Sequence, residues 1–346
     1  MNGMIGKIND DLFRRAILPH TGAAKPQVIV GPRMGVDAAI VKIGDEYMAI
    51  AEDPIFPGPT TTPGDFGWIT VHIGASDVAV TGIKPQFMTY SLLLPPGTPD
   101  DYIEALVRSI SETAGELGIT IVGGHTGYYS SVTVPTIGGI TVWGLGRDFV
   151  TPAGAQVGDA VIVTKGVAIE AAGVLASEFG DKLLAAGISG HLVERARLRL
   201  REMSVVADAA TATDVGGVHA MHDATEGGLE RGLWEIAEAS GVGLRIERDK
   251  VPVPDDVRAI CDFFKLNPFQ VISEGTLVLT CGSDKTGELL QGFERAGIPA
   301  AEIGQVVPLE EGRYWIEDGG RKRKLLPPPV DRFWEAFFSA LSQKDD

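Results

Sequence analysis

The chain has 346 residues, of which 44% are hydrophobic and 22% are charged, and it carries a formal net charge of -16 at pH 7. This composition excludes a disordered chain, because enough apolar surface is present to offset the entropy of the chain. The negative charge argues against broad binding to nucleic acids or anionic membrane surfaces, which are themselves negatively charged. At roughly 150 residues per domain, the length predicts two globular domains.

The two cysteines, Cys261 and Cys281, form neither a disulfide framework nor a zinc-ligand spacing, so we interpret them as inert thiols. The N-terminal stretch from Met1 to Lys7 lacks the long apolar core of a secretory signal. Apolar runs stay well below the ~20 residues that cross a bilayer. These features predict a cytoplasmic protein that does not enter a membrane.

The first half predicts strands and helices joined by glycine-rich turns. Short apolar runs over residues 28–50 are typical of strands, and helices are expected over residues 65–81 and 99–117. Thr98 and Asp101 form a capping pattern at the start of the second helix. A buried strand is expected over residues 119–122, and another strand over residues 139–144.

The run from Arg147 to Gly154 predicts a domain boundary near residue 150. Beyond it we expect an α/β alternation, with elements over residues 160–164, 169–178, 192–206, 229–240, 243–246 and 276–280. The arginines within 192–206 are interpreted as a solvated helix face. An aromatic helix around Phe333 to Phe338 is expected to dock through its aromatic stripe.

Acidic residues next to glycine turns suggest a divalent cation. Asp37 follows Gly35 and precedes an apolar run, and Asp53 follows another such run. Mg²⁺ takes oxygen ligands from one or two carboxylates and leaves further positions to substrate phosphates. Each aspartate alone is also compatible with a cap on its own turn, but the combination favours the cation.

Asp77 lies in a segment, residues 71–80, that is apolar nearly all round and is therefore expected to be a buried helix. A buried carboxylate needs a partner, either a metal or a structural group, because its desolvation costs several kcal/mol. His72 of the same segment is interpreted as a core histidine and not as a ligand.

Two glycine-containing loops are expected to bring backbone amides to an anion. In the first, residues 123–126, His125 either hydrogen-bonds a phosphate or holds the turn, since histidine is a poor ligand for Mg²⁺. The second, residues 222–229, leads into an amphipathic helix whose free amides would form an anion site, with Asp223 able to bring a cation to it.

Motifs of P-loop, dinucleotide-binding, zinc-protease and serine-hydrolase proteins are absent from the sequence. The motifs that are present resemble, in order, those of the superfamily of aminoimidazole ribonucleotide (AIR) synthase, thiamine-monophosphate kinase, selenophosphate synthetase and the hydrogenase-maturation protein HypE. Taken together, these motifs are most similar to those of HypE-like proteins. The matching segments lie within residues 5–310 and are 31–32, 35–39, 53–54, 76–79, 82–85, 123–126 and 222–229.

The resemblance implies an α/β (α+β) fold with a two-domain, PurM-like architecture. Residues 1–150 would form an N-terminal domain that binds ATP and magnesium and whose sheet closes a barrel across a homodimer. Residues 151–346 would form a C-terminal α/β domain with a tail. ATP would lie between the domains, near the dimer interface.

The resemblance also implies roles for individual residues. The catalytic residues would be Asp53, Asp77 and Asp223, and the ligands of Mg²⁺ would be Asp37, Asp53 and Asp77. The cofactor-binding positions would be Gly35, Asp37, Gly123, Gly124, His125, Thr126, Gly227 and Gly228.

The implied activity is ATP-dependent phosphoryl transfer or dehydration, in which an acceptor oxygen attacks the γ-phosphate. His125 stands where relatives have an acidic residue, and the chain ends at Asp346 where HypE carries a cysteine. We therefore expect a HypE-like enzyme with a different acceptor, either a small molecule or a carbamoyl-type group, and a maturation protein as a candidate partner. The alternatives are a thiamine-monophosphate kinase-like enzyme and a catalytically reduced nucleotide-binding partner in hydrogenase maturation.

Overall fold

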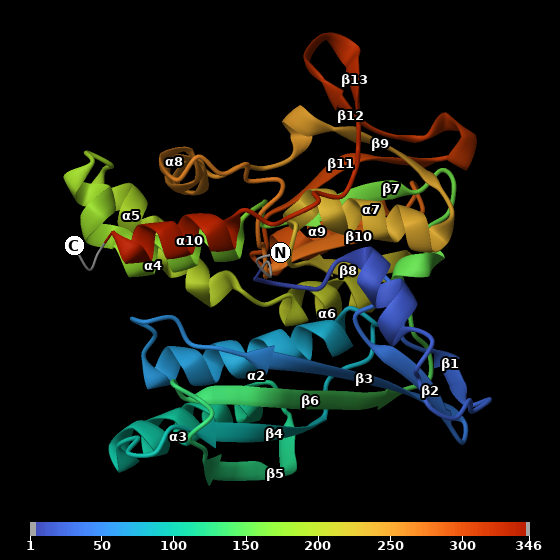
Figure 1. The fold of residues 1–346 in the computed structure, drawn as a ribbon. Coiled ribbons are helices and arrows are strands. Elements are labelled where there is room, and N and C mark those ends of the chain that lie inside the picture. The colour runs from blue at the N-terminus through green and yellow to red at the C-terminus, as the bar shows by residue number, and fades with distance from the viewer. Residues whose placement is uncertain (1–4, 344–346) are drawn as a thin grey trace. The chain divides into compact units, whose positions relative to one another are not determined.

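The computed structural model describes residues 5–343, so residues 1–4 of the N-terminal stretch and residues 344–346 of the tail lie outside the described part. The chain divides into two compact units (Figure 1). Unit 1 comprises Met1–Ala23, Pro32–Val36 and Val150–Asp346, and unit 2 comprises Ala24–Gly31 and Asp37–Phe149. Each unit has its own sheet, and the chain crosses between the units more than once.

Unit 2 contains a six-stranded sheet with the strand order β1-β2-β3-β6-β4-β5. Its strands are β1 (Val28–Val30), β2 (Ala39–Ile43), β3 (Glu46–Ile55), β4 (Phe87–Leu94), β5 (Thr120–Tyr128) and β6 (Thr136–Gly146). Neighbouring strands are antiparallel except β4 and β5, which are parallel. Because parallel neighbours need a crossover connection, α3 (Asp100–Glu116) lies between β4 and β5 in the sequence.

The helices α2 (Pro63–Ala79) and α3 cover one face of this sheet (Figure 1). Side chains alternate between the two faces of a strand, and Ala49, Met88 and Ile140 are fully buried on the helix side. Gly67 allows the close crossing of the two helices, because a Cβ atom there would lie 2.6 Å from Cβ of Ser109. The apolar alternation of the strands thus fixes which face the helices cover.

Unit 1 contains a seven-stranded sheet with the strand order β13-β12-β9-β11-β7-β10-β8. Its strands are β7 (Ala160–Thr164), β8 (Val218–Ala224), β9 (Gly243–Glu247), β10 (Thr276–Cys281), β11 (Ala300–Val307), β12 (Arg313–Glu317) and β13 (Arg321–Lys324). The helix α7 (Gly228–Ser240) packs against β8 and β10. Its apolar side joins a buried cluster that includes Leu229, Leu233 and the fully buried Trp315.

A second buried cluster joins four further helices of unit 1, namely α4 (Ile169–Ala185), α5 (Gly190–Leu198), α8 (Asp255–Phe263) and α10 (Phe333–Ser342). Phe333 and Phe337 of α10 are buried in it, whereas Phe338 is 43% exposed. The expected docking of an aromatic helix through one stripe is therefore confirmed. The remaining helices of ordinary length are α6 (Val206–Val215) and α9 (Thr286–Arg295), which contact each other.

The expected single helix over residues 192–206 is wrong. The chain forms α5, then a short 3₁₀ segment at Arg199–Glu202, and only then α6. The interpretation of its arginines as a solvated face is also wrong for Arg199, which donates to Asp256 with Nε at 2.8 Å and a terminal nitrogen at 3.1 Å. Burial alone raises the pKa of Asp256, but these bonds lower it overall, so the arginine neutralises a buried carboxylate.

The N-terminal segment belongs to unit 1 and contains the short helix α1 (Asp10–Leu12), followed by a π-helical turn at Phe13–Ile17. Asn9 caps α1 by accepting the N–H of Leu12 at 2.8 Å. Among the helices of the described residues, none is both long and apolar enough to span a membrane.

The close crossing of α2 and α3 predicts a stability difference between two glycines. Gly67→Ala should destabilise the protein by about 1–3 kcal/mol, because the added methyl group meets Ser109 and the main chain of Ile110. Gly115→Ala, at a position of α3 with open space around it, should be neutral or stabilising by up to about 1 kcal/mol. Urea unfolding of both variants measures the difference, and equal effects would contradict the packing argument.

Candidate functional site

Two of the predicted metal ligands of unit 2 lie near its sheet. Asp37 precedes β2 by two residues, and Asp53 lies near the end of β3 at an irregularity in its pairing with β6. Ala49 and Ala51 of β3 are buried, so the alternation of the strand turns Asp53 toward the helix side. One carboxylate oxygen of Asp53 is inaccessible to solvent. This environment suits a carboxylate that binds a cation or a strong donor.

Asp77 lies in the last turn of α2 between the buried residues Ser76 and Val78, but is itself only half-buried. Within unit 2, the described residues include no three acidic, histidine or cysteine side chains whose ligand atoms all lie within 4.8 Å of one another. The aspartates of unit 2 therefore form no closed metal cage. An open set of carboxylate oxygens is still the donor type that suits Mg²⁺, which commonly completes its coordination with water and phosphate oxygens.

The expected loop at residues 123–126 is wrong, because β5 continues through it to Tyr128. Gly124 has a φ of +147°, and a Cβ atom there would collide with the carbonyl oxygen of Tyr90 on β4. The glycine thus serves the close pairing of β4 and β5. Gly123 and Thr126 are exposed on the same strand, which forms one edge of the sheet.

His125 is also exposed on β5, and its Nε2 lies 2.5 Å from the hydroxyl group of Tyr129. Of the two roles that the sequence left open, the structure favours a local one, in which the histidine holds the chain just beyond the strand. Its predicted role in cofactor binding stays a prediction.

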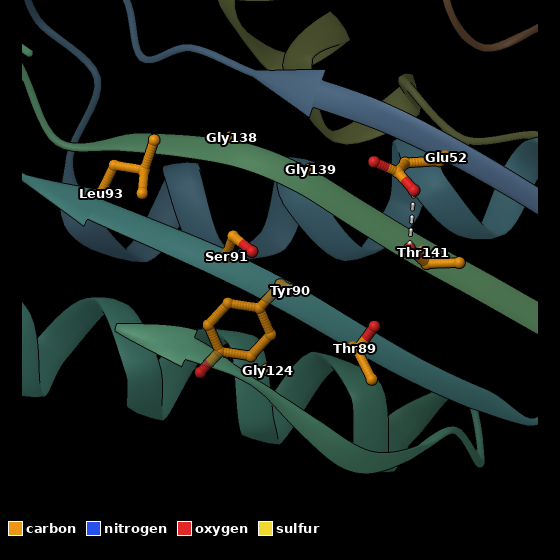
Figure 2. Close-up of a pocket in the computed structure, with 9 residues that line it drawn as sticks. All are labelled: Glu52, Thr89, Tyr90, Ser91, Leu93, Gly124, Gly138, Gly139 and Thr141. Carbon is orange, nitrogen blue, oxygen red and sulfur yellow. Dashed lines mark hydrogen bonds between the residues drawn. The ribbon is translucent and has the colours of Figure 1, made fainter. Parts of the chain in front are cut away.

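A pocket of about 420 Å³ lies on the face of the unit 2 sheet that α2 and α3 do not cover (Figure 2). Hydroxyl groups of Thr89, Ser91 and Thr141 line it together with the carboxylate of Glu52, which accepts a hydrogen bond of 3.0 Å from Thr141. The remaining lining residues are Tyr90, Leu93, Gly124, Gly138 and Gly139. Sequence reasoning assigned no role to Glu52. Because side chains alternate along β3, Glu52 and Asp53 point to opposite faces of the sheet.

The candidate site of unit 1 lies where β8 ends and α7 begins. Asp223 is 1% exposed and pairs in the sheet with Leu277 of β10. The preceding residue, His222, is also buried and donates from Nε2 to Glu235 of α7 at 2.8 Å. The predicted residue Asp223 thus has an acid–base pair as its direct neighbour.

Glu235 is the centre of a series of charged side chains, called the charge chain below, which runs from His222 through Glu235 and Arg231 to Asp10. Arg231 donates to Glu235 from Nε at 3.0 Å and to Asp10 of α1 from a terminal nitrogen at 2.7 Å. Burial alone raises the pKa of Glu235, but the hydrogen bond from His222 and the positive charges around it lower the pKa to about 2. Gly35, a predicted cofactor residue, packs here, because a Cβ atom on it would lie 2.8 Å from Cβ of Glu235.

The start of α7 differs from the free anion site that the sequence suggests. The N–H of Gly227 donates to the carboxylate of Asp331 at 2.8 Å, and the N–H of Gly228 donates to the carbonyl of Thr225 at 3.0 Å. A Cβ atom at Gly228 would lie 2.5 Å from the carbonyl oxygen of Val271. The glycines therefore form a tight turn, and the carboxylate of Asp331 occupies the position that a bound anion would take.

The N-terminal segment and the first turn of α4 also meet this turn. Lys7 donates its main-chain N–H to Glu226 at 2.7 Å and its ammonium group to Thr225 at 3.2 Å. Glu170 of α4 accepts the N–H of Glu274 at 3.1 Å. Burial is the main cause that raises the pKa of Glu170 to about 7.

Sequence reasoning missed six residues of this region, namely Lys7, Asp10, Glu170, Arg231, Glu235 and Asp331. The spacing of Arg231 and Glu235 on one helix was a usable signal for an ion pair. Their partner Asp10 is 221 positions away from Arg231, and no local pattern reports such a contact.

Two family models match most of the chain. The model of the N-terminal domain of AIR synthase related proteins matches residues 35–145, and the model of the C-terminal domain matches residues 156–316. The chain belongs to the AIR synthase-related proteins. It therefore has the mixed α/β, two-domain fold that the resemblance implied.

The carbamoyl dehydratase HypE of Cupriavidus necator is 30% identical over 299 residues, which cover 82% of this chain and 80% of the relative. A solved structure of E. coli HypE is 26% identical, has a TM-score of 0.71, and is matched over 90% of this chain and 96% of its own. Another solved HypE, in complex with ATP, is 23% identical with a TM-score of 0.66, over 94% and 96% of the two chains. HypE is thus among the proteins similar to this chain in both sequence and fold.

The charge chain around Glu235 predicts a pH-dependent stability. Because its pKa is lowered in the folded state, Glu235 stabilises the protein above its ordinary pKa of 4.5, and this contribution is lost as the pH falls toward 2. Glu235→Gln should cost about 3 kcal/mol of unfolding free energy at pH 7, at about 1.36 kcal/mol per pKa unit. The difference from the unsubstituted protein should shrink between pH 4.5 and 3 in denaturant titrations.

The matched control for this measurement is Glu238→Gln, on the same helix, where the side chain of Glu238 is 46% exposed. We expect a change below about 1 kcal/mol in this variant. A cost for Glu235→Gln that is equally small, or that does not depend on pH, would contradict the role of the charge chain.

Proposed function

We propose that the protein is an ATP- and Mg²⁺-dependent enzyme of the HypE-like branch, which uses the γ-phosphate of ATP to activate an acceptor oxygen for phosphoryl transfer or dehydration. The observation that carries the proposal is the likeness to carbamoyl dehydratase HypE over four-fifths of both chains. The ATP complex of another similar HypE supports the choice of nucleotide. The acceptor that we favour is an uncharged carbamoyl-type group.

In this proposal, Asp37, Asp53 and Asp77 hold Mg²⁺, whose bound charge would neutralise the phosphate oxygens during transfer. The position of Asp53 at a strand end, with one oxygen sealed from solvent, supports its role as the fixed ligand of the set. Asp223, buried next to the His222–Glu235 pair, is assigned to the acceptor side. A carboxylate there can accept a proton or a hydrogen bond from a carboxamide nitrogen.

The two glycine segments keep more limited roles in the proposal. Gly227 and Gly228 shape the turn that precedes α7, on the acceptor side, and Gly35 lets the chain pass close to Glu235. The exposed Gly123 and Thr126 are assigned to the nucleotide together with Gly124 and His125. A hydrogenase-maturation protein is the proposed protein partner, since the similar proteins carry that function in their names.

The proposal predicts that the purified protein consumes ATP in the presence of Mg²⁺ and a carbamoylated acceptor and releases ADP. Asp53→Asn should reduce turnover at least about 100-fold, because one ligand of the metal loses its charge. Asp45→Asn, an exposed residue of the turn between β2 and β3, is the control and should leave turnover unchanged. The products are separated by chromatography after incubation with each variant.

The outcomes separate the proposal from its alternatives. Turnover with thiamine monophosphate, but not with a carbamoylated acceptor, would replace the HypE-like activity by a kinase activity. Tight ATP binding without turnover of either acceptor would favour a nucleotide-binding partner protein. The absence of ATP binding would overturn the assignment altogether.

We further propose that the chain is a homodimer that pairs through the sheet of unit 2. The support is an edge strand, β5, whose residues 122–126 are all exposed, beside a sheet face that α2 and α3 leave uncovered. Val122 on this strand is 52% exposed, and an exposed apolar edge is a surface on which a second copy can add its own strand.

This pairing predicts a mass in solution of twice the 36.6 kDa of one chain. Val122→Glu should shift the protein toward the monomer, because two like charges would meet across the interface. Val134→Glu, at a 44% exposed position of the same unit outside β5, should leave the mass unchanged. Light scattering after size exclusion measures the masses. A monomeric unsubstituted protein would contradict the proposal.

A further inference from the structure

The sheet of unit 1 ends in a strand made entirely of basic residues. Strand β13 has the sequence Arg-Lys-Arg-Lys and is the outermost strand of the sheet, and its hairpin with β12 lies at the outer end of the sheet in Figure 1. The outer side of an edge strand is a row of main-chain N–H and C=O groups, which can pair with an extended segment of another chain. A wholly basic strand stands out on a protein with a net charge of -16.

The pairing of β13 with β12 separates its residues onto two faces. Trp315 of β12 is buried in the cluster that α7 joins and is paired with Arg323, so Arg323 lies on the helix side. There its guanidinium group donates to Glu317 at 2.9 Å and to Glu230 of α7 at 3.0 Å. Arg321, two residues earlier, is also bound to Glu317. The chain thus neutralises both arginines itself.

The two lysines lie on the opposite face, around one aromatic ring. Lys324 is paired with Tyr314 of β12, and Tyr314 is paired with Arg245 of β9, so these three side chains form one row across the strands. The ammonium group of Lys322 lies 5.5 Å from the centre of the Tyr314 ring. The three basic residues are exposed. The exposed surface of Arg245, Tyr314, Lys322 and Lys324 is called the basic face below.

The charge of the basic face is not balanced within unit 1. Among the described residues, no acidic side chain forms an ion pair with Lys322, Lys324 or Arg245. Glu247, on the same face of β9 as Arg245, is bound to Lys250 at 3.0 Å. Three uncompensated cations at one edge of the sheet therefore create a local positive potential on an acidic protein.

We propose that this edge of unit 1 binds an extended acidic segment of a partner protein, which adds a strand to β13 and places its carboxylates on the basic face. The main chain of β13 supplies the hydrogen bonds that hold the segment. Because side chains alternate along a strand, acidic residues at every second position face Lys322 and Lys324. The inference concerns unit 1 alone and does not depend on the proposed enzymatic activity.

The charges argue against two other occupants. A nucleic acid carries a long row of phosphates, which a protein of net charge -16 repels beyond the small basic face. Strand β13 of a second copy would bring lysines next to lysines across the new pairing, which is unfavourable. A short acidic segment meets neither obstacle.

The experiment titrates the full chain with a short fluorescent peptide in which glutamate alternates with threonine. We expect a dissociation constant below about 1 mM, and no binding of the same peptide with lysine in place of glutamate. Lys322→Glu/Lys324→Glu should weaken binding at least about tenfold, because two attractions become repulsions. The matched control is Lys25→Glu/Lys42→Glu, which changes the net charge equally at two exposed positions of unit 2. Its effect should stay below about twofold, since distant charges are screened by salt.

Two readouts distinguish an added strand from simple attraction between charges. Amide hydrogen exchange in residues 321–324 should slow when the peptide binds, because outward N–H groups gain partners, whereas exchange in β5, the edge strand of the other sheet, should not change. A peptide methylated at every main-chain nitrogen keeps its charge but loses its donors, so its binding should weaken at least about tenfold.

Several results would overturn the inference. These are no binding of the glutamate peptide, an equal loss in the control variant, unchanged exchange in β13, or equal binding of the methylated peptide. Tighter binding of a single-stranded oligonucleotide of equal charge would assign the basic face to nucleic acid. A mass that falls from two chains to one in Lys322→Glu/Lys324→Glu would assign the edge to a second copy.

Discussion

An ion pair and a main-chain hydrogen bond join the N-terminal segment to the start of α7 within unit 1. Arg231 and Asp10 are 221 positions apart, and Lys7 and Glu226 are 219 positions apart, with the whole of unit 2 between them. A contact of this range carries a large closure entropy, which local structure cannot repay. Each pair is therefore backed by a second bond, from Arg231 to Glu235 and from Lys7 to Thr225.

This arrangement explains why the start of α7 carries so many charged groups. Helix starts favour negative charge, and here Asp331 occupies the amide of Gly227. The turn also carries Glu226, whose carboxylate accepts the main-chain N–H of Lys7 from the N-terminal segment. Burial raises the pKa of Asp331, and the negative charge of Glu226 raises it further, whereas the N–H groups of Gly227 and Phe333 lower it.

The elements with clear periodicity could be predicted from the sequence. Strand β7 and helix α7 lie within a residue of their expected bounds, because their apolar patterns agree with their packing. The segment of residues 123–126 could not, since its glycines are typical of a turn and only the approach of Tyr90 on β4 explains them as part of a strand. The break between α5 and α6 was equally hidden, because Arg199 in this segment is bound to Asp256, more than fifty residues further on.

The candidate site likewise contains residues that the sequence reveals and residues that only the fold reveals. Asp53, Asp77 and Asp223 stand out in the sequence because carboxylates are unusual next to apolar runs. Glu235 and Asp331 do not stand out in the sequence, since they are ordinary acidic residues until folding brings them to His222 and Gly227.

Charge balance gives the strongest reason to expect a metal in the proposed reaction. In unit 1, the guanidinium groups of Arg199 and Arg231 are each bound to acidic side chains, so these cations are already neutralised by the chain. In the proposed reaction, a protein with a net charge of -16 needs positive charge at the phosphates of ATP, and the aspartates of unit 2 would supply it through a bound cation. The Mg²⁺ dependence of the proposed reaction thus has an electrostatic reason, because the aspartates and the phosphates would repel each other without the cation.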